Sequence, residues 1–213
     1  MTDEKDDENA NDGIKIILLG EAGSGKTNLI NACCNIKFNP NSTSNLTASF
    51  SEKRIEINKT QYYLRLWDTA GQEKYRSLNT LFIKDSQICI LVYDITRRET
   101  FKELDFWKKT VQELLGDKTF IAVVGNKSDL YENEEITQEE GEEYARKHHF
   151  QFLLTSAKCN PHEFELYVID LVKEFLEKNK FNQWEFVSYE NRGRITIDKN
   201  VAVKKKKECL CLI

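Results

Sequence analysis

Short apolar runs alternate along the chain with segments in which apolar residues recur at helical spacing. The runs are strand-sized and lie at residues 14–19, 54–57, 62–67, 88–93, 120–124 and 150–154. Helical spacing follows near residues 26–36, 73–83, 99–115, 137–149 and 161–178. Crossover helices force parallel pairing of strands, whereas the short Asn58-Lys59 connection permits an antiparallel hairpin. The pattern predicts an α/β domain with six strands, mostly parallel, and helices on both faces of the sheet.

The two ends of the chain differ in charge from the segment between them. Residues 1–12 carry six acidic side chains and one lysine without apolar periodicity, which is typical of a disordered leader. Residues 180–213 carry eight Lys or Arg against four Asp or Glu and are predicted to be a flexible basic tail. Residues 13–179 are long enough to bury a core and are predicted to form one domain. No apolar run reaches the eighteen residues that a membrane-spanning helix needs, so we expect a soluble body.

A glycine-rich loop follows the first apolar run and precedes the first helical segment. Its sequence, GEAGSGKT at residues 20–27, fits the phosphate-loop pattern GxxxxGK[ST] in the context that the pattern requires. Glycines allow several backbone amides to converge on one polyphosphate. Lys26 adds a charge at the β and γ phosphates, and the Thr27 hydroxyl is placed to ligate Mg²⁺. The predicted nucleotide-contacting residues are Glu21, Ala22, Gly23, Ser24, Gly25, Lys26, Thr27 and Asn28.

Two further polar segments follow the runs at 120–124 and 150–154, where a base could lie. Guanine presents N1–H and a 2-amino group that one carboxylate can accept together, so Asp129 is predicted to select guanine. Asn126 is expected to bridge loops and Lys127 to cover the base face. A backbone amide of the segment Ser156-Ala157-Lys158 is expected to donate to the guanine O6. The predicted base-site residues are Asn126, Lys127, Asp129, Ser156, Ala157 and Lys158.

A third segment, WDTAGQE at residues 67–73, closes the run at 62–67. Asp68 is placed to hold Mg²⁺ through its water shell, and the Gly71 amide to sense a γ phosphate. Gln72 would orient the attacking water in a reaction whose catalysis is mainly positioning and charge stabilisation. The predicted catalytic residues are therefore Gln72 and Lys26.

With GEAGSGKT, WDTAGQE, NKSD and SAK in this order, residues 14–178 resemble the Ras-superfamily small GTPases. The segments WDTAGQEKYRSL, LVYDIT, FKELDFW and EEGEEYA are similar to the Rab branch. The resemblance implies a small G domain of the P-loop NTPase class with five flanking helices. It also implies a monomeric GTP/GDP switch with Mg²⁺ that acts in vesicle traffic, on the cytoplasmic face of an intracellular membrane and in exchange with the cytosol.

The partners that the resemblance implies are a GAP, an exchange factor, an escort or GDI-type chaperone and effectors, with no nucleic acid among them. No arginine lies at residues 39–51, so an arginine finger must come from a partner and unassisted hydrolysis is expected to be slow. Phe50, Trp67 and Phe82 match an aromatic triad that presents the switch state to effectors. Burial in the core is the alternative for each ring.

Two aligned positions concern the switch itself. Phe38 matches the aromatic residue that packs on guanine, and Asn45 falls where the family has the threonine that ligates Mg²⁺ and touches the γ phosphate. Asn45 leaves open a second interpretation, a nucleotide-binding scaffold or pseudo-switch whose GTP state carries little information. A P-loop kinase or ATPase is disfavoured by NKSD at residues 126–129.

The chain ends in KKKKECLCLI, in which Cys209 and Cys211 resemble the double-cysteine tails of Rab proteins. A CaaX signal would need cysteine at Leu210. Two geranylgeranyl chains would anchor the protein stably, and each lysine would add about 1 kcal/mol near anionic lipid. We therefore predict prenylation of both cysteines, with an unmodified basic tail as the alternative.

Overall fold

The computed structural model describes residues 13–39, 49–69, 76–116 and 119–193, with the backbone alone described for 76–79 and 180–193. The chain divides into two units, Met1–Phe175 and Leu176–Ile213. The first unit holds the sheet and the helices that cover it.

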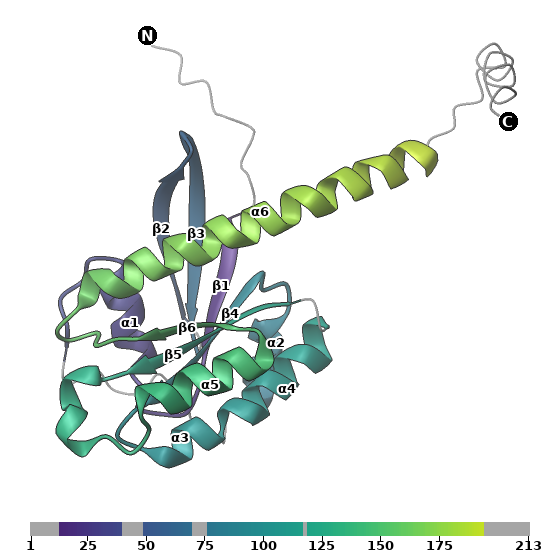
Figure 1. Cartoon of the computed structure of the whole chain (residues 1–213). Coiled ribbons are helices and arrows are strands. Elements are labelled where there is room, and N and C mark those ends of the chain that lie inside the picture. Colours follow the sequence, from purple (N-terminus) through teal and green to yellow (C-terminus); the bar gives the residue numbers. More distant parts are fainter. Residues whose placement is uncertain (1–12, 40–48, 70–75, 117–118, 194–213) are drawn as a thin grey trace, which may run out of the picture. The chain divides into compact units, whose positions relative to one another are not determined.

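Six strands form one sheet in the order β2-β3-β1-β4-β5-β6 (Figure 1). All neighbouring strands pair in parallel except β2 and β3, which are antiparallel. The predicted α/β architecture is confirmed. The strands are β1 (Ile14–Leu19), β2 (Ser49–Ile57), β3 (Thr60–Asp68), β4 (Ile88–Asp94), β5 (Phe120–Asn126) and β6 (Gln151–Leu154).

The antiparallel pair is closed by the tight turn that the sequence predicts. Asn58 and Lys59 both have positive φ, 52° and 65°, and Ile57 pairs with Thr60 across the turn. Positive φ at both central residues is typical of the hairpin turn whose twist matches that of the strands it joins. The turn therefore sets the register of the two longest strands of the sheet.

Helices follow most strands and flank the sheet. They are α1 (Lys26–Cys33), α2 (Arg76–Ile83), α3 (Arg98–Lys102), α4 (Leu104–Leu115), α5 (Gln138–His148) and α6 (Pro161–Gly193), with a 3₁₀ helix, η2, at Ser128–Asn133. The single helix predicted over 99–115 is instead two helices that meet at Glu103, whose φ of −72° and ψ of −9° stay in the helical region. Helix α6 continues beyond the predicted end at 178, because no Gly or Pro follows Pro161 until Gly193.

Thr137 followed three residues later by Glu140 has the spacing of a capping box, and the box is present at the start of α5. The Glu140 amide donates to Thr137 Oγ1 at 3.3 Å, and the Thr137 amide donates to Glu140 Oε2 at 3.1 Å. Two amides that the helix leaves without an internal partner are thereby satisfied. The cap fixes where α5 begins, directly after the loop that contains η2.

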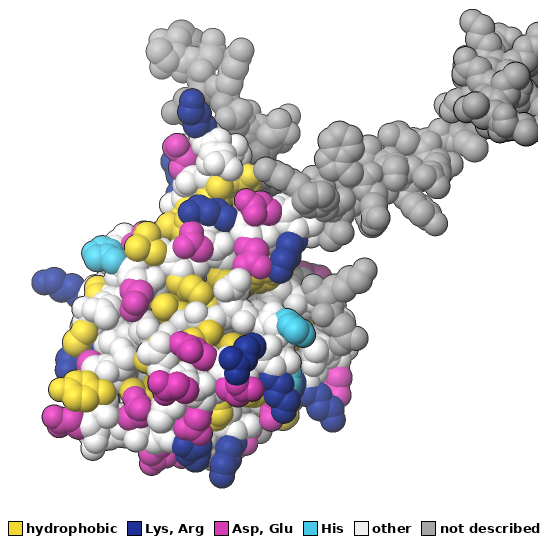
Figure 2. Space-filling model, viewed as in Figure 1, with side chains coloured by type: hydrophobic (Ala, Val, Ile, Leu, Met, Phe, Trp, Pro, Cys, Tyr) yellow, Lys and Arg dark blue, Asp and Glu magenta, His cyan; other side chains and the backbone are white. Residues whose placement is uncertain are grey.

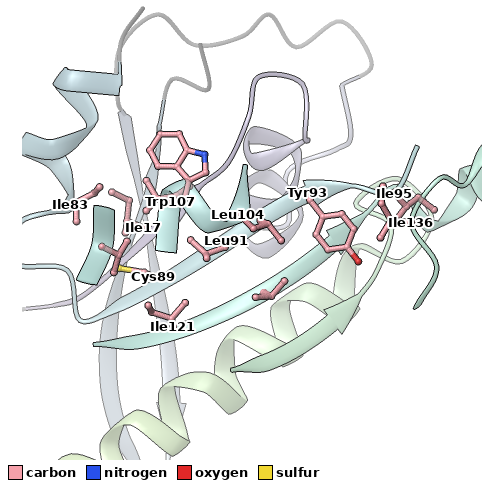
Figure 3. Close-up of a cluster of buried hydrophobic side chains, with 13 residues drawn as sticks. Ile17, Ile83, Cys89, Leu91, Tyr93, Ile95, Leu104, Trp107, Ile121 and Ile136 are labelled. Atoms are coloured by element: carbon pink, nitrogen blue, oxygen red, sulfur yellow. The ribbon is translucent and has the colours of Figure 1, made fainter. Parts of the chain in front are cut away.

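One face of the sheet packs against α4 and neighbouring elements, as Figure 3 shows. Alternate residues of the central strands point to this face, and Leu104, Trp107 and Val111 of α4 meet them at spacings of three and four. The strand residues of this cluster are Ile17, Leu19, Cys89, Leu91, Tyr93, Ile121 and Val123. This packed layer holds the parallel strands so that their carboxyl ends share one edge.

No helix among the described residues combines the length and the apolar character that crossing a bilayer requires. Charged side chains of both signs are intermixed over the face of the molecule shown in Figure 2.

Candidate functional site

The residues predicted to bind a nucleotide follow the carboxyl ends of four strands. The sheet register places Leu18 beside Asp68 and places Asp94 beside Asn126. Ligands of open α/β sheets bind at this edge. The loops after β1, β3, β5 and β6 are thus brought together by the sheet, although they are far apart in sequence.

The loop after β1 has a conformation that needs its glycines. Gly20, Gly23 and Gly25 have φ of 149°, 76° and 92°. A Cβ on Gly20 would lie 2.1 Å from the Val92 carbonyl oxygen, and one on Gly25 would lie 2.2 Å from Asn126 Nδ2. Both the dihedral angles and the lack of space exclude a side chain, so the backbone is shaped as a phosphate cradle would require.

Lys26, the first residue of α1, is a buried cation whose hydrogen-bond partners are neutral. Its Nζ donates to the carbonyl oxygens of Gly20 at 2.8 Å and Glu21 at 3.0 Å, and the residue is 5% exposed. Burial lowers the pKa of Lys26 to about 8, although the charges of Asp68 and Glu21 oppose the change. A polyphosphate at this loop would supply the counter-charge that carbonyl groups do not.

Thr27 and Asp68 meet beside Lys26. Thr27 Oγ1 donates to Asp68 Oδ2 at 2.7 Å, and the Thr69 hydroxyl holds the turn after β3 by donating to the Leu18 carbonyl at 2.7 Å. Within the described ranges, no three His, Cys, Asp or Glu side chains gather into a metal-binding group. Mg²⁺ is usually held by one or two carboxylates together with substrate phosphates and water. The hydroxyl and carboxylate present here fit that ion, which would neutralise charge developing on the phosphates.

Asn126, at the end of β5, joins two loops as its predicted bridging role requires. Its Nδ2 donates to the Ser24 carbonyl at 2.9 Å, and its Oδ1 accepts from the Ala157 amide at 3.2 Å. The side chain is 2% exposed. The phosphate loop and the loop after β6 are therefore held through one buried amide group.

Asp129 lies in η2, opposite the loop after β6. Its Oδ1 accepts from Ser156 Oγ at 2.6 Å, and Lys158 Nζ lies 3.7 Å from its Oδ2. Ser156 Oγ in turn accepts from the amides of Lys158 and Cys159 at 3.2 and 3.0 Å. A carboxylate has further lone pairs, so Asp129 retains capacity for a base edge. Contact of a loop amide with guanine O6 stays a prediction.

Asp94, at the end of β4, is a site residue that the sequence reasoning missed. It is 1% exposed; its Oδ2 accepts from Lys127 Nζ at 2.6 Å and from Arg97 Nε at 3.1 Å. Burial alone would raise the pKa of Asp94, but hydrogen bonds from Lys127 and Thr96 outweigh burial and hold it below its usual value. The signal in the sequence was its position, because β4 ends at the same edge of the sheet as β1, β3, β5 and β6, whose loops carry the predicted site residues.

Residues 15–177 match the Ras family. The chain belongs to the Ras family of small GTPases. It is 41% identical to Ras-related protein Rab-21 of Geodia cydonium over 165 residues, which are 78% of this chain and 72% of that protein. It is 39% identical to Rab-21 of Homo sapiens over 163 residues, 76% of this chain and 72% of the relative. It is 35% identical to Ras-related protein SEC4 of Saccharomyces cerevisiae over 196 residues, 92% and 90% of the two chains.

These similarities make the chain a Rab-like small GTPase, and Ras-family GTPases bind GTP and GDP. The described residues of this GTPase do not include all of its predicted site. Asn45, Gly71 and Gln72 lie outside them, as do Cys209 and Cys211. Phe38 is described and 39% exposed, but none of the described ring contacts or hydrogen bonds includes it. The adjacent Asn39 amide donates to Asn28 Oδ1 at 3.4 Å, which ties this stretch to α1.

The three rings predicted as an effector-facing triad lie in a row in this Rab-like GTPase. The ring centroids of Phe50 and Trp67 are 5.1 Å apart, and those of Trp67 and Phe82 are 5.7 Å apart. Phe50 is 51% exposed, whereas Phe82 and Trp67 pack partly against the core cluster. The row thus reaches from the core to the surface of the β2–β3 hairpin, and contact of its exposed end with effectors stays a prediction.

Proposed function

We propose that this GTPase is a membrane-associated switch in vesicle traffic, which binds Mg²⁺·GTP at the carboxyl edge of the sheet and hydrolyses it slowly. The observation that supports this most strongly is the double contact of Asn126. Through this contact the phosphate loop lies next to the two loops predicted to bind the base. This arrangement supports a single site that would hold the phosphates and the base of one guanine nucleotide. The exposed end of the aromatic row, at Phe50, would give effectors a hydrophobic contact.

Hydrolysis in this proposal rests on Gln72 and Lys26, with Gln72 orienting the attacking water. Single-turnover hydrolysis of GTP by the full chain tests it. Gln72→Leu is expected to slow hydrolysis at least about tenfold while GTP stays bound, because the lost amide acts on the water and not on the nucleotide. The matched control is Gln138→Leu on the exposed start of α5, which should hydrolyse GTP at the wild-type rate. Wild-type hydrolysis by Gln72→Leu would contradict the role.

Magnesium in this proposal is held by Thr27, Asp68 and Asn45, with the last in the place of the family's threonine. Asn45 is also the observation that favours a second candidate function, the pseudo-switch. Comparing the GAP and effector responses of GDP-loaded and GTP-loaded chain separates the two. A switch binds effectors and responds to the GAP differently in the GDP-loaded and GTP-loaded states. A pseudo-switch gives the same responses in both states, and Asn45→Thr is then expected to make the responses differ.

Membrane attachment is proposed to come from a basic tail at residues 180–213 with lipid on Cys209 and Cys211, beside a G domain at 13–179 and an acidic leader at 1–12. Intact mass of the chain from a eukaryotic host tests the lipid. Two added geranylgeranyl groups are expected, and loss of both in the Cys209→Ser, Cys211→Ser double variant. Cys159→Ser, which changes an exposed cysteine of the G domain, should leave the added mass unchanged. Absence of added mass from the wild-type chain would refute the anchor.

A further inference from the structure

Arg97 is a cation that contacts the phosphate loop and has no role in the proposed recognition or hydrolysis of GTP. It lies between β4 and α3, with extended backbone angles of −142° and 102°. Its Nη2 donates to the Ala22 carbonyl of the phosphate loop at 2.8 Å, although the two residues are 75 positions apart. A Cβ built on Gly23 would lie 3.4 Å from the same nitrogen, so the guanidinium covers the Ala22–Gly23 peptide.

The orientation of the Ala22–Gly23 peptide depends on a contact from outside the phosphate loop. Its carbonyl and the Gly23 amide belong to one planar unit, so fixing the direction of the carbonyl fixes the opposite direction of the N–H group. Gly23 has a positive φ of 76° and no side chain to restrict it, which leaves this peptide free to rotate in the absence of a partner. The contact from Arg97 therefore orients an amide of the phosphate loop.

Asp94 links Arg97, and thereby its contact with the phosphate loop, to the base end of the site. The same Oδ2 atom accepts from Arg97 Nε at 3.1 Å and from Lys127 Nζ at 2.6 Å. Its Oδ1 accepts from the Thr96 amide at 2.9 Å and from the Thr96 hydroxyl at 2.7 Å, which fixes the carboxylate plane. The position of the guanidinium thus depends on the carboxylate that also holds the base-loop lysine.

We propose that Arg97 is a positioning residue for nucleotide binding. Its hydrogen bond to the Ala22 carbonyl orients the Ala22–Gly23 peptide so that the Gly23 amide faces the phosphates. The Asp94 carboxylate, which accepts from both Arg97 and Lys127, couples this orientation to the loop that contains Lys127. The consequence is slower release of GDP. The contact is at the weak end of charge-assisted hydrogen bonds, because Arg97 is 36% exposed. Its removal should speed release about fivefold to tenfold.

The neighbouring Arg98 provides a matched control. It is similarly exposed, at 42%, and forms an ion pair with Glu140 of α5 at 2.7 Å, away from the phosphate loop. Substituting either arginine removes one positive charge from the same turn. A general effect of charge or of helix α3 on GDP release would therefore appear in the variants of both arginines. An effect of positioning the phosphate loop would appear in the Arg97 variant alone.

The test is release of fluorescently labelled GDP from the full chain in excess unlabelled GDP and Mg²⁺. Arg97→Ala is expected to release about five to ten times faster than wild type, Arg97→Lys about two to three times faster, and Arg98→Ala within about twofold. The ³¹P resonance of the β phosphate of bound GDP should shift in Arg97→Ala and stay in place in Arg98→Ala.

Equal release by wild type and Arg97→Ala would overturn the proposal, as would equal acceleration in Arg98→Ala or faster release without a ³¹P shift. If Arg97→Ala does not fold, Arg97→Lys carries the same test, and wild-type release from it would contradict the role. The inference rests on GDP binding by the proposed switch. A wild-type chain that retains no GDP overturns both, whereas retention with no effect at Arg97 overturns the positioning role alone.

Discussion

The base end and the phosphate end of the site are built differently. At the base end, Asn126 and Asp129 are held by hydrogen bonds to Ser24, Ala157 and Ser156, so polar side chains meet polar partners. At the phosphate end, Lys26 is nearly as buried as Asn126, but among the described residues its hydrogen-bond acceptors are the neutral carbonyls of Gly20 and Glu21.

In the proposed site, this difference implies that the two ends contribute to nucleotide binding in different ways. The base end is organised by the protein itself, and its residues stabilise the fold with or without a ligand. The phosphate end holds a charge that burial disfavours, as the lowered pKa of Lys26 records. An anionic ligand would offset the free-energy cost of burying the Lys26 ammonium. The phosphate end should therefore stabilise the nucleotide-bound protein and destabilise the nucleotide-free protein.

The largest effect is expected at Lys26. Lys26→Met should weaken GDP binding by about a thousandfold, since it removes a buried cation facing the phosphates. The same change should raise the free energy of unfolding of nucleotide-stripped chain by about 1–3 kcal/mol, because no buried ammonium remains. Calorimetric titration and urea unfolding measure the two quantities. A variant that loses stability together with affinity would contradict the contrast between the two ends.

Asp129→Asn should change which base is bound more than how firmly the chain folds. Replacing an acceptor by a donor removes the match to guanine N1–H and the 2-amino group, and we expect about a hundredfold shift from GTP toward XTP. Competition of the two nucleotides against labelled GDP measures the shift. Guanine selectivity equal to that of the wild type would refute the assignment of Asp129.

Asn126→Ala should lower both stability and affinity, in contrast to Lys26→Met. It leaves a buried carbonyl and a buried amide without their partner, which costs about 1–3 kcal/mol of unfolding free energy. GDP affinity should fall about tenfold, because the phosphate loop loses its tie to the loop after β6. Asn133→Ala, on the exposed end of η2, is the control and should change neither quantity. An Asn126→Ala variant as stable as wild type would break the comparison.

The smallest effect is the pH dependence of GDP binding. Burial lowers the pKa of Lys26 to about 8, and bound phosphates should raise it, so the contribution of Lys26 is complete below about pH 8 and is lost as pH rises further. Affinity should fall about fivefold to tenfold from pH 7.5 to 9. Calorimetry at pH 8.5 in buffers of different ionisation enthalpy should detect proton uptake on binding, which Lys26→Met abolishes. Absence of uptake by wild type would show that phosphates do not face this ammonium.

The alternation of apolar runs was sufficient to predict the strands, and the short connection at Asn58-Lys59 to predict the antiparallel hairpin, because each depends on residues close in sequence. The ends of helices were harder to predict. The break at Glu103 leaves the backbone helical, and the continuation of α6 to Gly193 reflects the absence of a helix-breaking residue more than an apolar stripe.

The part of the site that sequence predicted is the part carried by contiguous motifs. Gly20 to Thr27 and Asn126 to Asp129 are such segments, and strand order brings them to one edge. Asp94 and Arg97 were not predicted as site residues, because Asp94 stands in LVYDIT, a segment used only for the family resemblance, and Arg97 stands in none of the quoted segments. Their roles come from contacts with Lys127 and Ala22, which only the folded chain places beside them.

The most direct test of the site as a whole is calorimetric titration of nucleotide-stripped chain with GTP and with ATP in the presence of Mg²⁺. Both nucleotides present the same phosphates to Lys26, so any difference between them reports the base end alone. We predict that GTP binds at least about a thousandfold more tightly than ATP, because a site built to hydrogen-bond one base leaves buried groups unpaired with another. Equal affinities, or no binding of GTP by folded protein, would contradict this description of the site.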